Sequence, residues 1–234
     1  MGIISLEHSS DLFWLGRYLE RTFTMQRALL SVYDKCIDND VTARRDFLAK
    51  LYIEDEWGRE NANACFHDLI FNIENPHSVR YSLERAYDNA IVLRERISTE
   101  ALSQIQLAMD AVDAGAHSIH SAAYSMLGLE DRLFAFWGCV SDHVYDNEVL
   151  NLIRCGKSIE RLDMYIRLEY PAMDMKREFD RFCDTLRNVP RDTPYRYNSK
   201  QLSVLVESFD LGLEYTDRKD ECLVSLSKIF EPNV

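Results

Sequence analysis

The chain has 234 residues, of which 47% are hydrophobic and 28% charged, and this composition excludes an intrinsically disordered protein. Its 27 basic and 39 acidic residues leave a net charge of −12, which disfavours binding to nucleic acid or to an anionic membrane surface. The longest apolar run, about residues 133–140, is far shorter than the roughly 20 residues of a transmembrane helix. We therefore expect a soluble protein that binds neither nucleic acid nor membrane.

The cysteines and the N-terminal residues predict the compartment. The six cysteines include no CxxC pair, a pattern typical of reduced thiols in the cytosol. The first residues lack the basic region and cleavage site of a signal peptide. Together these features predict a cytoplasmic protein.

Residues that break helices are scarce, with only eight glycines and five prolines in the chain. Apolar residues recur at spacings of three and four, and the strict alternation of a strand is hard to find. The sequence predicts an all-α fold with no sheet. We expect more than about 60% helix, against roughly one-third in an ordinary globular protein.

In chain order, the first helix should begin near Ser9 or Ser10 and end near residue 36, and a short helix should follow Thr42. The next is expected over residues 54–71, with the acidic residues 54–56 at its N-terminus, where negative charge is favourable. Asn75 and Pro76 read as the N-cap and first position of a helix that ends near residue 97.

Thr99 is expected to cap a helix that Gly128 ends after about residue 126. Further helices are expected over residues 130–142, 147–169 and 172–187, with Pro171 between the last two. Residues 188–199 predict a loop. The final two helices should cover residues 200–213 and 217–230.

Two of these helices share the pattern Gly-x3-Glu-Arg-x5-Arg. The copies are offset by 140 residues throughout, and they comprise Gly16, Glu20, Arg21 and Arg27, then Gly156, Glu160, Arg161 and Arg167. A degenerate third copy contains Glu84 and Arg85. The repetition predicts an internally duplicated helix.

Helical geometry places the first-copy residues Gly16, Glu20 and Arg27 within about 40° of one another, while Arg21 points away. An apolar stripe runs beside this line in each copy, so we expect the glutamates and the last arginines at the edge of the buried face. Asp163 falls inside the second stripe, where a carboxylate needs a cationic or hydrogen-bonding partner. Each glycine permits close approach of a neighbouring helix.

Two interpretations of this Glu/Arg layer remain open. It is either a structural layer of salt bridges between duplicated helices, or a polar site that binds a ligand or carries chemistry. The duplication suggests that the two helices pack about a pseudo-twofold axis. If they run antiparallel, Glu20 should pair with Arg167 and Glu160 with Arg27.

Three ordered stretches resemble the bacterial Alpha-E family of all-helical proteins: residues 13–21 (FWLGRYLER), 75–98 (with NPHSV, DNA and LRERIS) and 154–163 (RCGKSIERLD). The middle stretch includes Arg94, while Tyr87 and Ile91 stand where the family has arginines. The resemblance implies one Alpha-E-like domain over residues 1–234, with its motifs in residues 9–170 and a divergent helical tail over 171–234.

The resemblance also implies a context for function. Alpha-E proteins are usually encoded beside, or fused to, a circularly permuted ATP-grasp amide ligase. The expected function is that of a helical partner subunit in ATP-dependent peptide synthesis or modification, with a peptide or small molecule as a further ligand. The alternative is an enzyme that uses the Glu/Arg cluster itself.

A metal-dependent helical bundle is a third, weaker interpretation. Di-iron bundles use Glu-x-x-His motifs, and the sequence has none. Asp113, His117 and His120 share one helical face and are weak candidates for a metal site. There is no glycine-rich phosphate loop and no nucleophile motif, so we expect no cofactor.

Overall fold

A computed structural model describes residues 5–38, 40, 42–57, 61–116, 119–189, 193–210 and 215–230, except for the side chains of 119–125 and 210. Helices make up 81% of it, and no described residue lies in a strand. The prediction of an all-α fold with more than 60% helix is therefore confirmed. None of the described helices is both long and apolar enough to span a membrane.

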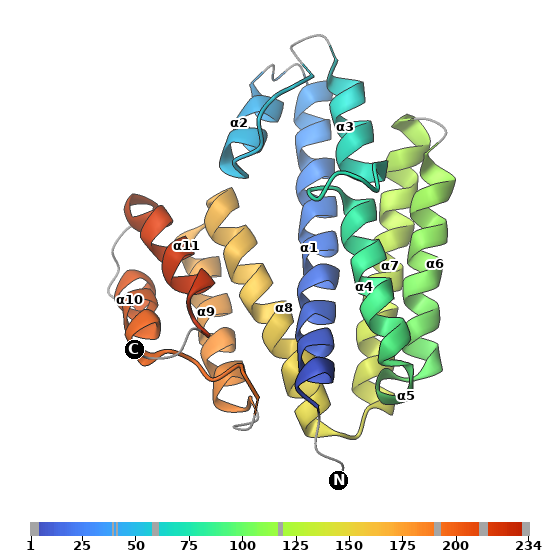
Figure 1. Ribbon diagram of the computed structural model, residues 1–234. Coiled ribbons are helices and arrows are strands. Elements are labelled where there is room, and N and C mark those ends of the chain that lie inside the picture. The colour runs from blue at the N-terminus through green and yellow to red at the C-terminus, as the bar shows by residue number, and fades with distance from the viewer. Residues whose placement is uncertain are drawn as a thin grey trace. The chain divides into compact units, whose positions relative to one another are not determined.

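The described helices follow one another along the chain (Figure 1). In chain order they are α1 (Leu6–Ile37), α2 (Ala43–Lys50), α3 (Ala62–Phe71), α4 (Val79–Val92), α5 (Arg94–Ile97), α6 (Thr99–Gly115), α7 (Ile119–His143), α8 (Asn147–Leu168), α9 (Ala172–Arg187), α10 (Ser199–Asp210), the 3₁₀ helix η1 (Tyr215–Arg218) and α11 (Lys219–Ser227).

The chain divides into two compact units. Unit 1 comprises residues 1–17 and 146–234, and unit 2 comprises residues 18–145. Helix α1 contributes its first part to unit 1 and the rest to unit 2. The single domain expected over residues 1–234 stays a prediction.

Unit 1 is built around α8, which packs against α9 and α11. The side chain of Asp146 caps α8 by accepting a hydrogen bond from the N–H of Glu148 at 2.9 Å. Glu169 adopts a left-handed conformation with φ of 59° and ends the helix ahead of Pro171. Helix α9 buries an apolar stripe at helical spacing, formed by Met175, Phe179, Phe182 and Leu186.

In unit 2, α6 packs against α7 and α4 (Figure 1). Small buried residues of α4 and α6, among them Ala86, Ala90, Ala101 and Ala108, share this core with larger side chains such as Leu83 and Phe136. The side chain of Ser78 caps α4 by accepting from the N–H of Tyr81 at 2.9 Å.

The acidic residues 54–56 do not begin a helix, contrary to prediction, because α3 begins only at Ala62. Asp55 has a different role, since its carboxylate accepts a hydrogen bond from the buried Arg44 at 3.0 Å. The role of Asp55 in unit 2 is therefore to pair with the buried cation of Arg44, and not to interact with a helix dipole.

The start of α4 was also predicted wrongly. Asn75 does not cap it: its side chain accepts from the N–H of His77 at 2.9 Å and forms a turn before the helix. The cap is Ser78, and the helix breaks after Val92 before the short α5. Local hydrogen bonding of the asparagine competed with the capping role expected from the Asn-Pro pair.

A third difference concerns the glycines of the middle region. The predicted helix boundary at Gly128 is wrong, because α7 continues through Gly128 and Gly138. The break falls earlier, where α6 ends at Gly115. A glycine inside a helix costs only about 1 kcal/mol relative to alanine, so tertiary packing of α7 overrides it.

The six cysteines are free thiols, and three of them, Cys65, Cys155 and Cys222, are buried. Burial raises the pKa of Cys65 to about 11 and also raises the pKa of Cys155. At pH 8 the reactive thiolate of Cys65 should be only about 0.1% populated.

We therefore expect iodoacetamide at pH 8 to label the half-buried Cys139 and to leave Cys65 and Cys155 unmodified. Peptide mass spectrometry of the native protein measures this, and alkylation in urea, where all six should react, is the control. Labelling of Cys155 as fast as Cys139 would contradict the buried position.

Candidate functional site

The glycines of the two motif copies lie at a close crossing of α1 and α8 within unit 1. A β-carbon on Gly16 would stand 2.0 Å from the carbonyl oxygen of Ile153, and one on Gly156 would stand 1.9 Å from that of Phe13. Real β-carbons essentially never approach another atom within 3.0 Å, so only glycine permits this contact. The predicted role of both glycines is confirmed.

The contacts at the crossing repeat under the 140-residue offset of the motif. Gly16 meets Ile153, and Gly156 meets Phe13, which is the counterpart of Ile153 in the first copy. Reciprocal contacts of this kind are the mark of a twofold relation. The two helices run in the same direction here (Figure 1), so the pseudo-twofold is confirmed at the crossing and the antiparallel arrangement is wrong.

Glu160, one turn beyond Gly156, is fully buried and held by Arg17 of α1. Nε and Nη2 of Arg17 each lie 2.7 Å from Oε2 of Glu160. A buried carboxylate needs such a charge-assisted partner, since an unpaired charge would carry a large desolvation cost. Glu160 therefore has the expected arginine partner, but the arginine is Arg17 and not Arg27.

The next residue, Arg161, connects α8 to a different helix. Its Nη1 lies 3.4 Å from Oε2 of Glu178 on α9. Glu178 is only 6% exposed, and Arg177 and Arg181 also contact its carboxylate, at 3.5 and 2.7 Å. Consecutive helical residues point about 100° apart, so Glu160 faces α1 while Arg161 faces α9.

These four residues, Arg17, Glu160, Arg161 and Glu178, form what we call the three-helix junction. Aromatic side chains flank it, since the guanidinium of Arg17 lies 4.7 Å from the ring centre of Trp14. The ring of Phe13 in turn stacks on Tyr195 at 4.2 Å. The junction is therefore part of a packed core in unit 1 and ties α1, α8 and α9 together.

Asp163 has the cationic partner that the sequence analysis required. Arg167, one turn along α8, donates to both of its oxygens, Nε to Oδ2 at 2.6 Å and Nη2 to Oδ1 at 3.2 Å. This bidentate pair lies near the surface, with 16% of the Asp163 side chain exposed. It stabilises the last turns of α8.

In unit 2, Glu20 of the first copy is 1% exposed and accepts from the hydroxyl of Thr24 at 3.2 Å. Arg21 is half-buried, but Arg27 is exposed, with its guanidinium 5.3 Å from the ring centre of Phe23. The predicted burial of Glu20 is confirmed and that of Arg27 is wrong. The predicted pair of Glu20 with Arg167 depended on the antiparallel arrangement and loses that support.

The degenerate third copy also takes part in an ion-pair cluster of unit 2. Arg80, which stands in place of the motif glycine, donates to Glu84 within α4 and to Asp113 of α6, the latter at 2.8 Å. Arg85 is half-buried and Arg94 is exposed. In this copy the residue at the glycine position, Arg80, joins α4 to α6 through an ion pair, whereas the glycines of the other two copies permit a close helix crossing.

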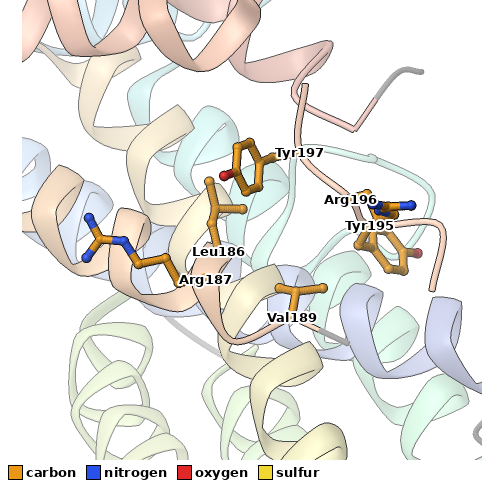
Figure 2. A pocket seen from close by; sticks show the side chains of 6 residues that line it. All are labelled: Leu186, Arg187, Val189, Tyr195, Arg196 and Tyr197. Carbon is orange, nitrogen blue, oxygen red and sulfur yellow. The ribbon is translucent and has the colours of Figure 1, made fainter. Parts of the chain in front are cut away.

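A cavity of about 440 Å³ opens in unit 1 where α9 leads into the segment before α10. It is lined by Leu186, Arg187, Val189, Tyr195, Arg196 and Tyr197. Figure 2 shows Val189 between Arg187 on one side and Tyr195 with Arg196 on the other. A second cavity of about 280 Å³ shares Leu186, Arg187 and Tyr197, so the two adjoin.

Comparison with known proteins identifies the family. A model of Alpha-E, described as a predicted alpha-helical domain with a conserved ER motif, matches residues 8–221. The chain belongs to the Alpha-E family. No curated protein and no solved structure matches it.

The match extends the resemblance beyond the motifs. The Alpha-E domain continues past residue 170 to residue 221, and so it includes α9, α10 and the beginning of α11. Helix α9 supplies Glu178, the partner of Arg161. The segment expected to be a divergent tail therefore completes the three-helix junction of this Alpha-E chain.

Two of the four junction residues were missed from the sequence. Arg17 lies directly after the motif glycine, and Glu178 lies in a helix of high charge where no single acidic residue stands out. Glu178 follows Met175 at a spacing of three and precedes Phe182 at a spacing of four, so its position inside the apolar stripe of α9 was the available signal.

Of the weak metal candidates, Asp113 is 57% exposed and paired with Arg80. His117 and the side chain of His120 lie outside the described residues. Within the described part of the Alpha-E chain, no three His, Cys, Asp or Glu side chains are grouped as metal ligands would be.

Proposed function

We propose that this Alpha-E protein is a helical, non-catalytic partner subunit of an ATP-grasp amide ligase that makes or modifies peptides. The observation that supports the non-catalytic part is the three-helix junction. Glu160 is 0% exposed and is held by Arg17 of α1, while Arg161 pairs with Glu178 of α9. The Glu-Arg dipeptide of the second copy thus has a structural role between helices.

An enzyme that used this cluster would have to bring its charged groups to a substrate. A general acid or base must come within hydrogen-bonding reach of the proton that it moves. The carboxylate of Glu160 instead lies in the packed contact between two helices. This contrast favours the partner role over the enzyme role, and the family resemblance supplies the class of partner.

The experiment combines this protein with the ATP-grasp ligase of its own genome. We expect the two purified proteins to co-elute in size-exclusion chromatography with light scattering. We also expect the rate of ATP-dependent amide formation to rise at least about 10-fold, equivalent to about 1.4 kcal/mol, relative to the ligase alone. An unrelated acidic helical protein serves as the control.

Two outcomes would contradict the proposal. One is a ligase that shows its full rate alone and does not co-elute with this chain. The other is turnover of a peptide substrate by this chain alone that is lost in the Glu160→Gln variant while the fold persists. The second outcome would favour the enzyme role.

A further inference from the structure

We propose that the two adjoining cavities of unit 1 form a binding site for an amphipathic carboxylate, of the size of an N-acylated dipeptide with an apolar C-terminal residue. Together the cavities fall within the roughly 300–1,000 Å³ of ordinary ligand pockets. This proposal does not depend on the ligase partnership proposed above, because binding to the site can be measured with the isolated protein.

The cavity of about 440 Å³ supplies the basic end. Arg196 lines it, is exposed, and makes no ion pair with any side chain in the described part of the chain. The other lining arginine, Arg187, already pairs with Asp184 at 2.8 Å. In a chain of net charge −12, a guanidinium that lines a cavity without an acidic partner is suited to bind an anion.

The wall beside Arg196 is held in place by the core. The ring of Tyr195 stacks on Phe13 of α1 at 4.2 Å, next to the crossing of α1 and α8. Figure 2 shows Tyr195 and Arg196 together, with the apolar side chains Leu186 and Val189 also in the lining of the cavity. A ligand anchored at Arg196 would therefore extend over apolar surface.

The cavity of about 280 Å³ supplies the apolar end, with Phe179, Cys183, Leu202 and Val206 in its wall. Its acidic residue is Asp180, whose carboxylate pairs with Lys176 at 2.6 Å. The other charged residue in its lining, Arg187, pairs with Asp184, so this end offers no uncompensated cation to a carboxylate. The ligand is therefore oriented, with its carboxylate at Arg196 and its apolar group past Tyr197, which lines both cavities.

Isothermal titration calorimetry with N-acetyl-alanyl-leucine tests the site, and we expect a Kd below about 1 mM. The C-terminal amide of the same dipeptide should bind at least about 10-fold more weakly, because it lacks the charge that Arg196 pairs with. The Arg196→Gln variant should bind the acid about 10-fold more weakly than the parent protein does. Octanoate, which has the carboxylate and an apolar chain but no peptide group, distinguishes a lipid-derived from a peptide-derived ligand.

The matched control is Arg45→Gln, which removes an exposed arginine of unit 2 and should leave the affinity unchanged. Arg196 is exposed, so its variant should keep the helical circular dichroism of the parent. The proposal is overturned if neither acid binds at millimolar concentration. It is also overturned if the amide binds the parent protein as tightly as the acid does. The same holds if the acid binds the Arg196→Gln variant as tightly as it binds the parent.

Discussion

The Gly156→Ala variant is expected to lose about 3 kcal/mol or more of its free energy of unfolding. The added β-carbon would stand 1.9 Å from the carbonyl oxygen of Phe13, a backbone atom that cannot move without displacing α1. Overpacking of a well-packed contact costs about 1–3 kcal/mol and sometimes more. Separation of the two helices would also disturb the contact of Arg17 with Glu160.

Urea denaturation measures the effect, and the chain offers a matched control. Gly138 lies inside α7, and a β-carbon added there would meet no described atom within 4 Å apart from its chain neighbours and the backbone of its own helix. Gly138→Ala should therefore stabilise the protein by about 0.5–1 kcal/mol through helix propensity. A Gly156→Ala variant within about 0.5 kcal/mol of the parent would contradict the close crossing.

The twofold relation extends this prediction to Gly16. The Gly16→Ala variant should be destabilised to a similar degree, because its β-carbon would meet Ile153 at 2.0 Å. Since both glycines belong to one contact, the double variant should lose less than the two single losses combined. Additive losses would mean that the two positions do not share a crossing.

The Glu160→Gln variant should also be strongly destabilised, by about 3 kcal/mol. Removal of one partner from a buried ion pair leaves the other charge without compensation and costs about 3–5 kcal/mol. Glutamine keeps the shape and one acceptor oxygen, which places the expected loss at the lower end. Chemical denaturation followed by circular dichroism measures it.

The control is an ion pair of similar composition at the surface. Asp184 and Arg187 contact each other at 2.8 Å, with 72% of each side chain exposed, and Asp184→Asn should cost less than about 1 kcal/mol. Equal losses in the two variants would show that Glu160 is not in a buried pair.

Glu20→Gln is also expected to destabilise the protein, as Glu160→Gln does, because Glu20 is 1% exposed. A ligand-binding role for Glu20 would instead leave stability unchanged and reduce activity with the partner ligase.

The residues whose burial or pairing could be predicted from the sequence are those whose role depends on their position along their own helix. The spacing of Glu20 and Glu160 beside apolar stripes predicted their burial, because a helical face is determined by position along one helix. Asp163 was expected to need a partner for the same reason, and Arg167 one turn away provides it. The close packing at Gly16 and Gly156 could also be predicted, because a glycine beside the apolar stripe has no side chain to keep a neighbouring helix away.

Helix ends were less predictable where several local signals competed. Asn75 and Ser78 are both good capping residues, and the tertiary fold uses only Ser78 for this role. Gly128 was expected to end a helix that passed through Gly115, but α6 ends at Gly115 and α7 continues through Gly128. A single sequence does not show which of two equivalent signals the packing selects.

By itself, the sequence determined the all-α fold, the duplicated motif and the buried glutamates, because each depends on composition or on spacing along the chain. The Alpha-E family was expected from the resemblance of three motifs, and the family match over residues 8–221 shows it. Only the tertiary structure decided that α1 and α8 cross in the same direction, that Arg17 holds Glu160, and that Arg161 binds Glu178 of α9. These pairs join residues that are 143 and 17 positions apart. The direction and register of packed helices set such partners, and no periodicity along one helix contains that information.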